Sequence, residues 1–311
     1  FAYYMLATLL PIDKIIGKIY PLFALALIFM AIGILVVLYT KGGVLPELWD
    51  GLHNTHPNAE ALPIFPIMFV SIACGAISGF HATQSPLMAR CMTNEHHGRP
   101  VFYGAMITEG IVALIWAAAA TIFFHDNGMA ESNASVVVND ITRSWLGTIG
   151  GVLAILGVVA APISTGDTAL RSARLIVADF LHLEQKKMRS RLLICIPIFL
   201  ITIGVLLYSL RDAAGFDMIW RYFAWVNQTL SVFTLFAVSV FLAKERSGHY
   251  YLVTLIPALF MLAVCSSYIV VAPEGFAKPQ SYILPVALGI SLVALVLFML
   301  WRQKMIHSRK N

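Results

Sequence analysis

The sequence predicts an all-α protein, a bundle of transmembrane helices, and two observations support this fold class. Of its 311 residues, 59% are hydrophobic and only 12% are charged, whereas about 25% of the residues of a soluble globular domain are charged. The apolar residues also gather into runs of about 20, the helix length that crosses a bilayer core. Because no long polar stretch separates these runs, we expect one transmembrane domain over residues 1–311.

Eight runs reach or approach this length, and a partial ninth, Phe1–Leu10, precedes them. The predicted spans are Ile19–Thr40, Leu62–Phe80, Phe102–Phe124, Leu146–Ile163, Leu192–Leu210, Trp220–Ala243, Tyr250–Ala272 and Tyr282–Trp301. The first residues resemble the tail of an earlier helix and lack a Met. We therefore expect the C-terminal part of a longer protein, with its N-terminal helices missing.

The basic residues give these spans an orientation. Sixteen of the 21 Lys and Arg residues fall in every second loop, and cytoplasmic loops carry such an excess. This predicts a cytoplasmic C-terminus, and it explains the net charge of +5 without a nucleic-acid partner. The four cysteines have no paired spacing, so no metal or other cofactor is expected.

Polar residues at membrane depth are costly and need a reason, and the stretch "SGFHATQSPLMAR", Ser78–Arg90, ends an apolar run with several of them. Its Pro86 cannot continue a regular helix without losing a hydrogen bond. Transporters use broken helices of this kind to bind substrate or ion, although a plain helix end at the interface is the alternative. The substrate-binding candidates here are His81, Thr83, Gln84 and Ser85.

The candidates for ion coupling are an acidic residue inside a predicted span and a polar group that contains a second acidic residue. Glu109 lies seven residues inside a predicted span, about 10 Å deep, where a carboxyl group is able to bind and release a proton. A structural hydrogen bond between helices is the other interpretation. After Pro162, a polar group is expected either to cap a new helix along the inner membrane surface or to line an ion path; it comprises Ser164, Thr165, Asp167 and Thr168.

Two adjacent amides, Asn227 and Gln228, lie in the aromatic run Ile219–Ala243. They are able either to hold helices together or to bind a peptide or carboxylate group. By contrast, the neighbouring His96 and His97 point apart on a helix and make a poor metal pair. No zinc, nucleophile-elbow or phosphate-loop motif occurs in the sequence, which argues against an enzyme.

Four of these segments together resemble the carbon starvation protein A family of bacterial inner-membrane transporters, in its shorter-chain branch. They are "FPIMFVSIACGAISGFHATQSPLMAR", the Glu109 helix, "STGDTALRSARLIVADFL" and "IWRYFAWVNQTLSVF", and the resemblance covers about Asp13–Ala243. It implies an inverted-repeat secondary-transporter fold with broken helices. It also implies proton-driven uptake of peptides or pyruvate during carbon starvation, with functional positions at His81, Thr83, Gln84, Ser85, Glu109, Asp167 and Asn227.

The sequence therefore predicts a transporter that takes a small-molecule substrate and a coupling cation, H⁺, across the bacterial inner membrane. A sodium-coupled amino-acid symporter of similar architecture is one alternative, with Ser164, Thr165 and Thr168 supplying oxygen atoms to Na⁺. A membrane enzyme or starvation sensor that transports nothing is the other. Dependence of uptake on Na⁺ or on pH separates the first pair, and any uptake excludes the sensor.

Overall fold

A computed structural model describes residues 4–5, 13–42, 45, 47, 49, 53–54, 59, 62–128, 134–211, 213–246 and 248–310. The elements formed by these residues are all helices, which confirms the predicted all-α class. The chain divides into two compact units: unit 1 comprises Phe1–Glu47 and Leu87–Ala213, and unit 2 comprises Leu48–Pro86 and Ala214–Asn311. Each unit has its own helices and its own hydrophobic core. That the two units form one transporter domain stays a prediction.

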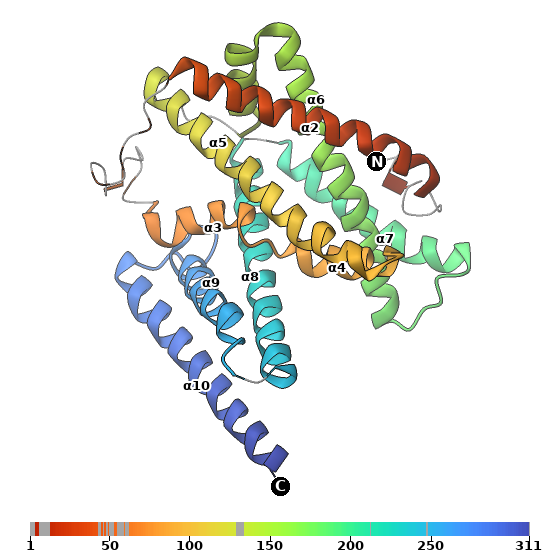
Figure 1. The fold of residues 1–311 in the computed structure, drawn as a ribbon, viewed down its shortest axis with the longest axis vertical. Helices are drawn as coiled ribbons and strands as arrows, with labels where there is room; N and C mark the ends of the chain where they lie inside the picture. Colours follow the sequence, from red (N-terminus) through yellow and green to blue (C-terminus); the bar gives the residue numbers. More distant parts are fainter. Residues whose placement is uncertain are drawn as a thin grey trace. The chain divides into compact units, whose positions relative to one another are not determined.

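Unit 1 is built around two long helices that lie side by side, α2 and α6 (Figure 1). Its elements are α2 (Asp13–Lys41), η4 (Glu95–His97), η5 (Arg99–Gly104), α5 (Ala105–Asn127), α6 (Ala134–Phe180) and α7 (Met188–Ser209). A Cβ atom on Gly157 of α6 would lie 2.8 Å from the carbonyl oxygen of Ala26 in α2. Glycine therefore sets the close approach of these two helices. The core between them and α5 includes Met30, Ile34, Ile115, Ala119, Ile141 and Ala154.

Unit 2 combines a broken helical segment with three long helices. Its elements are η2 (Ile64–Met68), α3 (Phe69–Ile72), η3 (Ala73–Gly75), the start of α4 (Phe80–Cys91), α8 (Ala213–Glu245), α9 (Leu252–Val271), η6 (Gln280–Tyr282) and α10 (Ile283–Lys310). Helices α9 and α10 form an antiparallel hairpin (Figure 1), and the Ser267 hydroxyl donates to the Ile283 carbonyl near its turn. The broken segment packs on α8 and α9 through Val70, Ala73, Val232, Val264 and Tyr268.

Six helical segments of the described residues are long and apolar enough to cross a membrane. They are Pro21–Lys41, Glu95–Asn127, Met188–Ser209, Gly215–Glu245, Leu252–Val271 and Gln280–Ser308. These six correspond to six of the eight predicted spans, and they make the chain a multi-pass membrane protein. The partial ninth span falls largely outside the described residues, which begin with Tyr4 and Met5.

The predicted span Leu62–Phe80 is wrong as a continuous helix. The chain instead forms three successive short turns, η2, α3 and η3, and leaves helical geometry again before α4 begins at Phe80. Two glycines favour the last interruption, because "ACGAISG" at residues 73–79 contains Gly75 and Gly79, and glycine is less favourable in a helix than other residues except proline.

The other differing region is α6, which continues through both the predicted span Leu146–Ile163 and the polar group that follows it. Asp167 therefore lies inside a helix and caps nothing, so the predicted new helix after Pro162 is wrong. The interruption in α6 comes earlier, at Gly147, whose φ of 68° and ψ of −171° are essentially restricted to glycine.

Candidate functional site

The main polar feature of unit 2 is a backbone crossing between residues 78–79 and helix α8. A Cβ atom on Gly79 would lie 2.1 Å from the carbonyl oxygen of Asn227 and 2.8 Å from Cβ of Leu230. Since real Cβ atoms do not approach a backbone oxygen this closely, only glycine permits the contact. The chain thus interrupts its helix where the backbone lies directly on α8.

Ser78 joins the two sides of this crossing. Its side chain is 7% exposed, and its Oγ accepts the Phe80 backbone N–H at 3.3 Å, which caps the start of α4. The Asn227 Nδ2 donates to the same Oγ at 3.3 Å. The Ser78 carbonyl oxygen lies 2.8 Å from Nδ1 of His81. One serine therefore connects the crossing with two of the predicted substrate-binding residues.

The position of the break differs from the one predicted. The sequence placed it over Ser78–Pro86, but α4 is helical from Phe80 to Cys91 and contains Pro86. The predicted residues of this stretch accordingly lie on α4, where His81, Thr83, Gln84 and Ser85 are half-buried. The Thr83 hydroxyl donates to the Phe80 carbonyl at 2.9 Å, inside the same helix. Only the residues before α4 are broken.

The two predicted amides of α8 are both buried. Asn227 is 6% exposed and Gln228 is 0% exposed. A fully buried amide requires partners for its donors and acceptors, and one face of α8 here also carries buried Ser231, whose hydroxyl donates to the Gln228 carbonyl at 2.7 Å. The structure therefore brings Asn227 to the broken segment, while Gln228 lies beside it in the interior of the unit.

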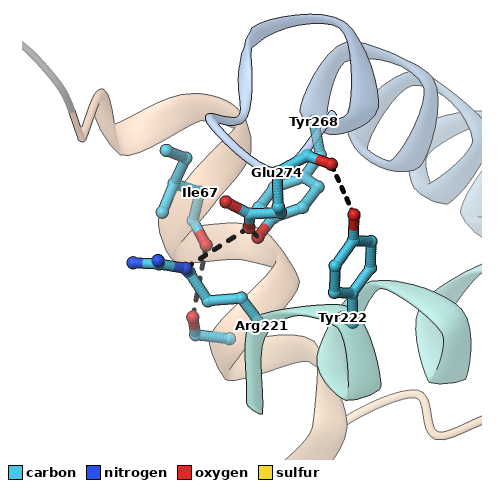
Figure 2. Close-up of polar contacts among 6 residues, drawn as sticks. Ile67, Arg221, Tyr222, Tyr268 and Glu274 are labelled. Carbon is cyan, nitrogen blue, oxygen red and sulfur yellow. Dashed lines mark hydrogen bonds and ion pairs between the residues drawn. The ribbon is translucent and has the colours of Figure 1, made fainter. Parts of the chain in front are cut away.

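Unit 2 contains a second polar cluster, which the sequence analysis did not predict (Figure 2). The Glu274 side chain, in the turn between α9 and α10, is 2% exposed and lies 3.4 Å from Nε of Arg221 in α8. The Tyr268 hydroxyl donates to Glu274 Oε1, and the Tyr222 hydroxyl donates to the Glu274 carbonyl at 2.6 Å. The second carboxylate oxygen, Oε2, is buried and accepts no hydrogen bond from the described part of the chain.

This Glu274 cluster (Arg221, Tyr222, Tyr268 and Glu274) fixes the α9–α10 turn to α8. Figure 2 also shows Ile67 of η2 next to it, and Ile67 packs in the same core as Tyr268. The available sequence signal was weak, since Glu274 follows a proline in a short loop and Arg221 lies near the end of an apolar run, where a basic residue is ordinary. An acid and a base at the same end of two adjacent apolar spans is the pattern that could have indicated it.

The predicted ion-coupling residues lie in unit 1. Glu109 is exposed on α5, within the membrane-crossing segment Glu95–Asn127. Asp167 is 2% exposed on α6, and its Oδ2 lies 3.6 Å from Nη2 of Arg171, one turn further along. An ion pair of this kind is one way for a buried carboxylate to offset its desolvation cost.

The hydroxyl residues next to Asp167 are half-buried. The Thr168 hydroxyl donates to the Thr165 carbonyl at 3.0 Å, as polar residues inside a helix commonly do. The Ser164 side chain falls outside the described residues. Gly166 packs against the ring of Tyr4, where a Cβ atom would lie 2.8 Å from the phenol oxygen. The Asp167 segment is thus a tightly packed polar region of α6.

Comparison with known proteins identifies a family and several relatives that match much of this chain. The model of the family described as "Carbon starvation protein CstA" matches residues 1–145 and 127–267. An uncharacterized membrane protein of Haemophilus influenzae is 46% identical over 149 residues, which are 43% of this chain and 40% of that protein. The peptide transporter CstA of Campylobacter jejuni is 26% identical over 302 residues, 75% of this chain and 43% of that protein.

A third relative is the pyruvate/proton symporter BtsT of Escherichia coli, which is 35% identical over 118 residues, 38% of this chain and 14% of that protein. The chain spans less than half the length of each of these three relatives. No solved structure matches the chain.

Proposed function

The chain belongs to the carbon starvation protein CstA family, and we propose that it carries helices of a proton-coupled transporter for peptides or small carboxylates such as pyruvate. The names of two relatives, a peptide transporter and a pyruvate/proton symporter, support this substrate class. The proposed location is the bacterial inner membrane with the C-terminus in the cytoplasm, because the spans predicted from the sequence leave sixteen of the 21 basic residues on the same side of the membrane.

The observation that carries the proposal is the buried bond between Ser78 and Asn227 at an interrupted helix. Interrupted backbone at membrane depth is tolerated where it is buried in protein or lines a cavity, and transporters place substrate at such breaks. A carboxylate accepts hydrogen bonds from amide, hydroxyl and imidazole donors. The proposed substrate-binding donors are accordingly His81, Thr83, Gln84, Ser85, Asn227 and Gln228.

We assign the coupling proton to Glu109. A charged carboxyl group in an apolar span is costly. Protonation of Glu109 together with substrate binding is therefore expected to change which conformational state of the transporter is favoured. Asp167 and its ion pair with Arg171, with Ser164, Thr165 and Thr168, would form a gate that rearranges as the substrate passes. Alternation between two states of different proton affinity would couple the two movements.

The test is uptake by the full-length protein in proteoliposomes with an imposed pH gradient. We expect accumulation of labelled pyruvate or of a labelled dipeptide that the pH gradient drives and that Na⁺ does not change. Uptake that follows a Na⁺ gradient instead would contradict proton coupling, and absence of uptake of both compounds by folded protein would contradict the proposed substrates.

Two matched variants test the coupling residue. Glu109→Gln is expected to abolish pH-driven accumulation while leaving exchange of substrate across the membrane. Glu95→Gln, which removes an exposed acid of η4 at the start of the same segment, is expected to behave like wild type. Full proton-driven uptake by Glu109→Gln would make the assignment of Glu109 wrong.

A further inference from the structure

Unit 1 contains a buried arginine that the transport proposal does not use. Arg174 of α6 is 8% exposed, and its Nε and Nη1 atoms are buried with no hydrogen-bond partner among the residues that the structure describes. The guanidinium group keeps its charge at any physiological pH. A buried charge without a counter-charge is strongly unfavourable, so this position requires an anion.

The charged side chains near Arg174 add positive charge. Arg171 and Arg191 of α7 are close enough to act electrostatically on it. Arg171 directs one nitrogen to Asp167, and the Nε of Arg191 donates to the Gln185 carbonyl at 2.6 Å. Two further arginines therefore lie near Arg174, and Arg174 forms no ion pair with the described residues.

The sequence around this arginine cluster (Arg171, Arg174 and Arg191) is typical of the edge of a bilayer. The turn between α6 and α7 carries Lys186 and Lys187, and Arg189 follows in the first turn of α7. Near this basic segment Phe180 is 83% exposed and Leu181 is 53% exposed. Exposed apolar side chains beside a basic segment favour the depth of lipid headgroups. An anion at this depth most often belongs to a phosphate group.

We propose that the arginine cluster is a binding site for a phosphate group, held by the buried nitrogens of Arg174. A guanidinium donates hydrogen bonds to phosphate oxygens from several N–H groups in one plane, and Nε and Nη1 of Arg174 are two buried donors that have no partner among the described residues. The phosphodiester of an anionic phospholipid supplies such a group from the membrane. Free inorganic phosphate supplies the same chemistry from solution.

The experiment uses delipidated full-length protein in neutral detergent. Its thermal stability is measured with added phosphatidylglycerol, with phosphatidylcholine, or with inorganic phosphate, and bound lipid is counted by native mass spectrometry. We expect wild-type protein to retain phosphatidylglycerol in preference to phosphatidylcholine. Arg174→Gln should retain about fivefold less of it, the effect of one basic side chain on an anionic headgroup.

The matched control is Arg189→Gln, which removes an exposed arginine of the same basic segment and should retain phosphatidylglycerol like wild type. Stabilisation by inorganic phosphate that also displaces the lipid would support the site and identify its source as soluble phosphate. Equal loss of lipid in both variants, or a wild-type protein that responds to neither phosphatidylglycerol nor phosphate, would overturn the proposal. The wild-type measurements stand even if Arg174→Gln does not fold, and Arg174→Lys, which keeps the charge without the planar fork, should bind lipid at an intermediate level.

Discussion

In unit 2 the buried carboxyl group of Glu274 faces a cation of the same unit, Arg221, whereas in unit 1 the buried guanidinium of Arg174 faces further arginines. The first arrangement is complete within the chain, and it serves to hold a turn against a helix. The second is complete only when an anion arrives from outside the described residues. A buried charge that is paired within the chain therefore indicates a structural role. A buried charge without such a pair indicates a binding site for a ligand.

The largest loss of stability is expected at the backbone crossing between residues 78–79 and α8 in unit 2. Gly79→Ala places a Cβ atom against the Asn227 carbonyl, nominally 2.1 Å away, so the segment must move off α8. We expect a loss of about 3 kcal/mol in stability, measured as the melting temperature in detergent. Gly289→Ala is the control, since nothing lies within 4 Å of its added atom. Equal melting temperatures for the two variants would show that the crossing is not tight.

Next in size is the ion pair of the Glu274 cluster. Arg221→Gln leaves a buried carboxylate without its cation, and we expect a loss of about 2 kcal/mol, below the range for fully buried pairs because the Arg221 side chain is 42% exposed. Adding Glu274→Gln to this variant should recover part of that loss, since it removes the unpaired charge. Losses that simply add in the double variant would show that the two residues are not coupled.

A smaller effect is expected at Ser78. Ser78→Ala removes the cap of α4 and the bond from Asn227, which should cost about 1 kcal/mol and reduce substrate affinity. The control Ser71→Ala removes an exposed hydroxyl that bonds only within its own segment, to the Ile67 carbonyl, and its melting temperature should match wild type. If both variants bind substrate equally well, Ser78 has no part in the site.

The smallest effect sharpens the comparison itself. In lipid-free and phosphate-free detergent, Arg174→Gln should leave the melting temperature unchanged or raise it, because it removes a buried charge that has no counter-ion. This outcome is opposite to that of Arg221→Gln, although both variants remove one arginine. A marked loss of stability in Arg174→Gln under these conditions would indicate an internal partner instead of a ligand.

The sequence predicted most of the fold, because hydrophobic runs of about 20 residues have few other structural solutions. The prediction failed where a segment has the apolar composition of a membrane span but not the backbone geometry of a continuous helix. Leu62–Phe80 is apolar enough to span a membrane, yet the two glycines of residues 73–79 weaken a helix there. In α6, Gly147 adopts a conformation reserved for glycine, but a glycine in an apolar helix more often marks close packing.

The candidate site was predicted only in part. Asn227 and the stretch after Ser78 stood out because polar groups at membrane depth are rare. Their hydrogen bond joins residues 149 positions apart, and no local pattern predicts such a pairing. Glu274 and Arg174 were missed as functional positions because each occupies a segment where charge is ordinary, a loop and a basic helix end. Only burial distinguishes them from a solvated side chain.

The most direct test of a substrate route at the crossing is the reactivity of a single cysteine there. Ser78→Cys would be made in full-length protein whose native cysteines, including Cys91, Cys195 and Cys265, are replaced. The rate of its alkylation by a maleimide is then measured with and without pyruvate or a dipeptide. We predict that the transported compound slows alkylation at position 78 and does not slow it at an exposed control cysteine in place of Ser71. An alkylation rate at position 78 that a transported compound leaves unchanged would contradict the proposed site.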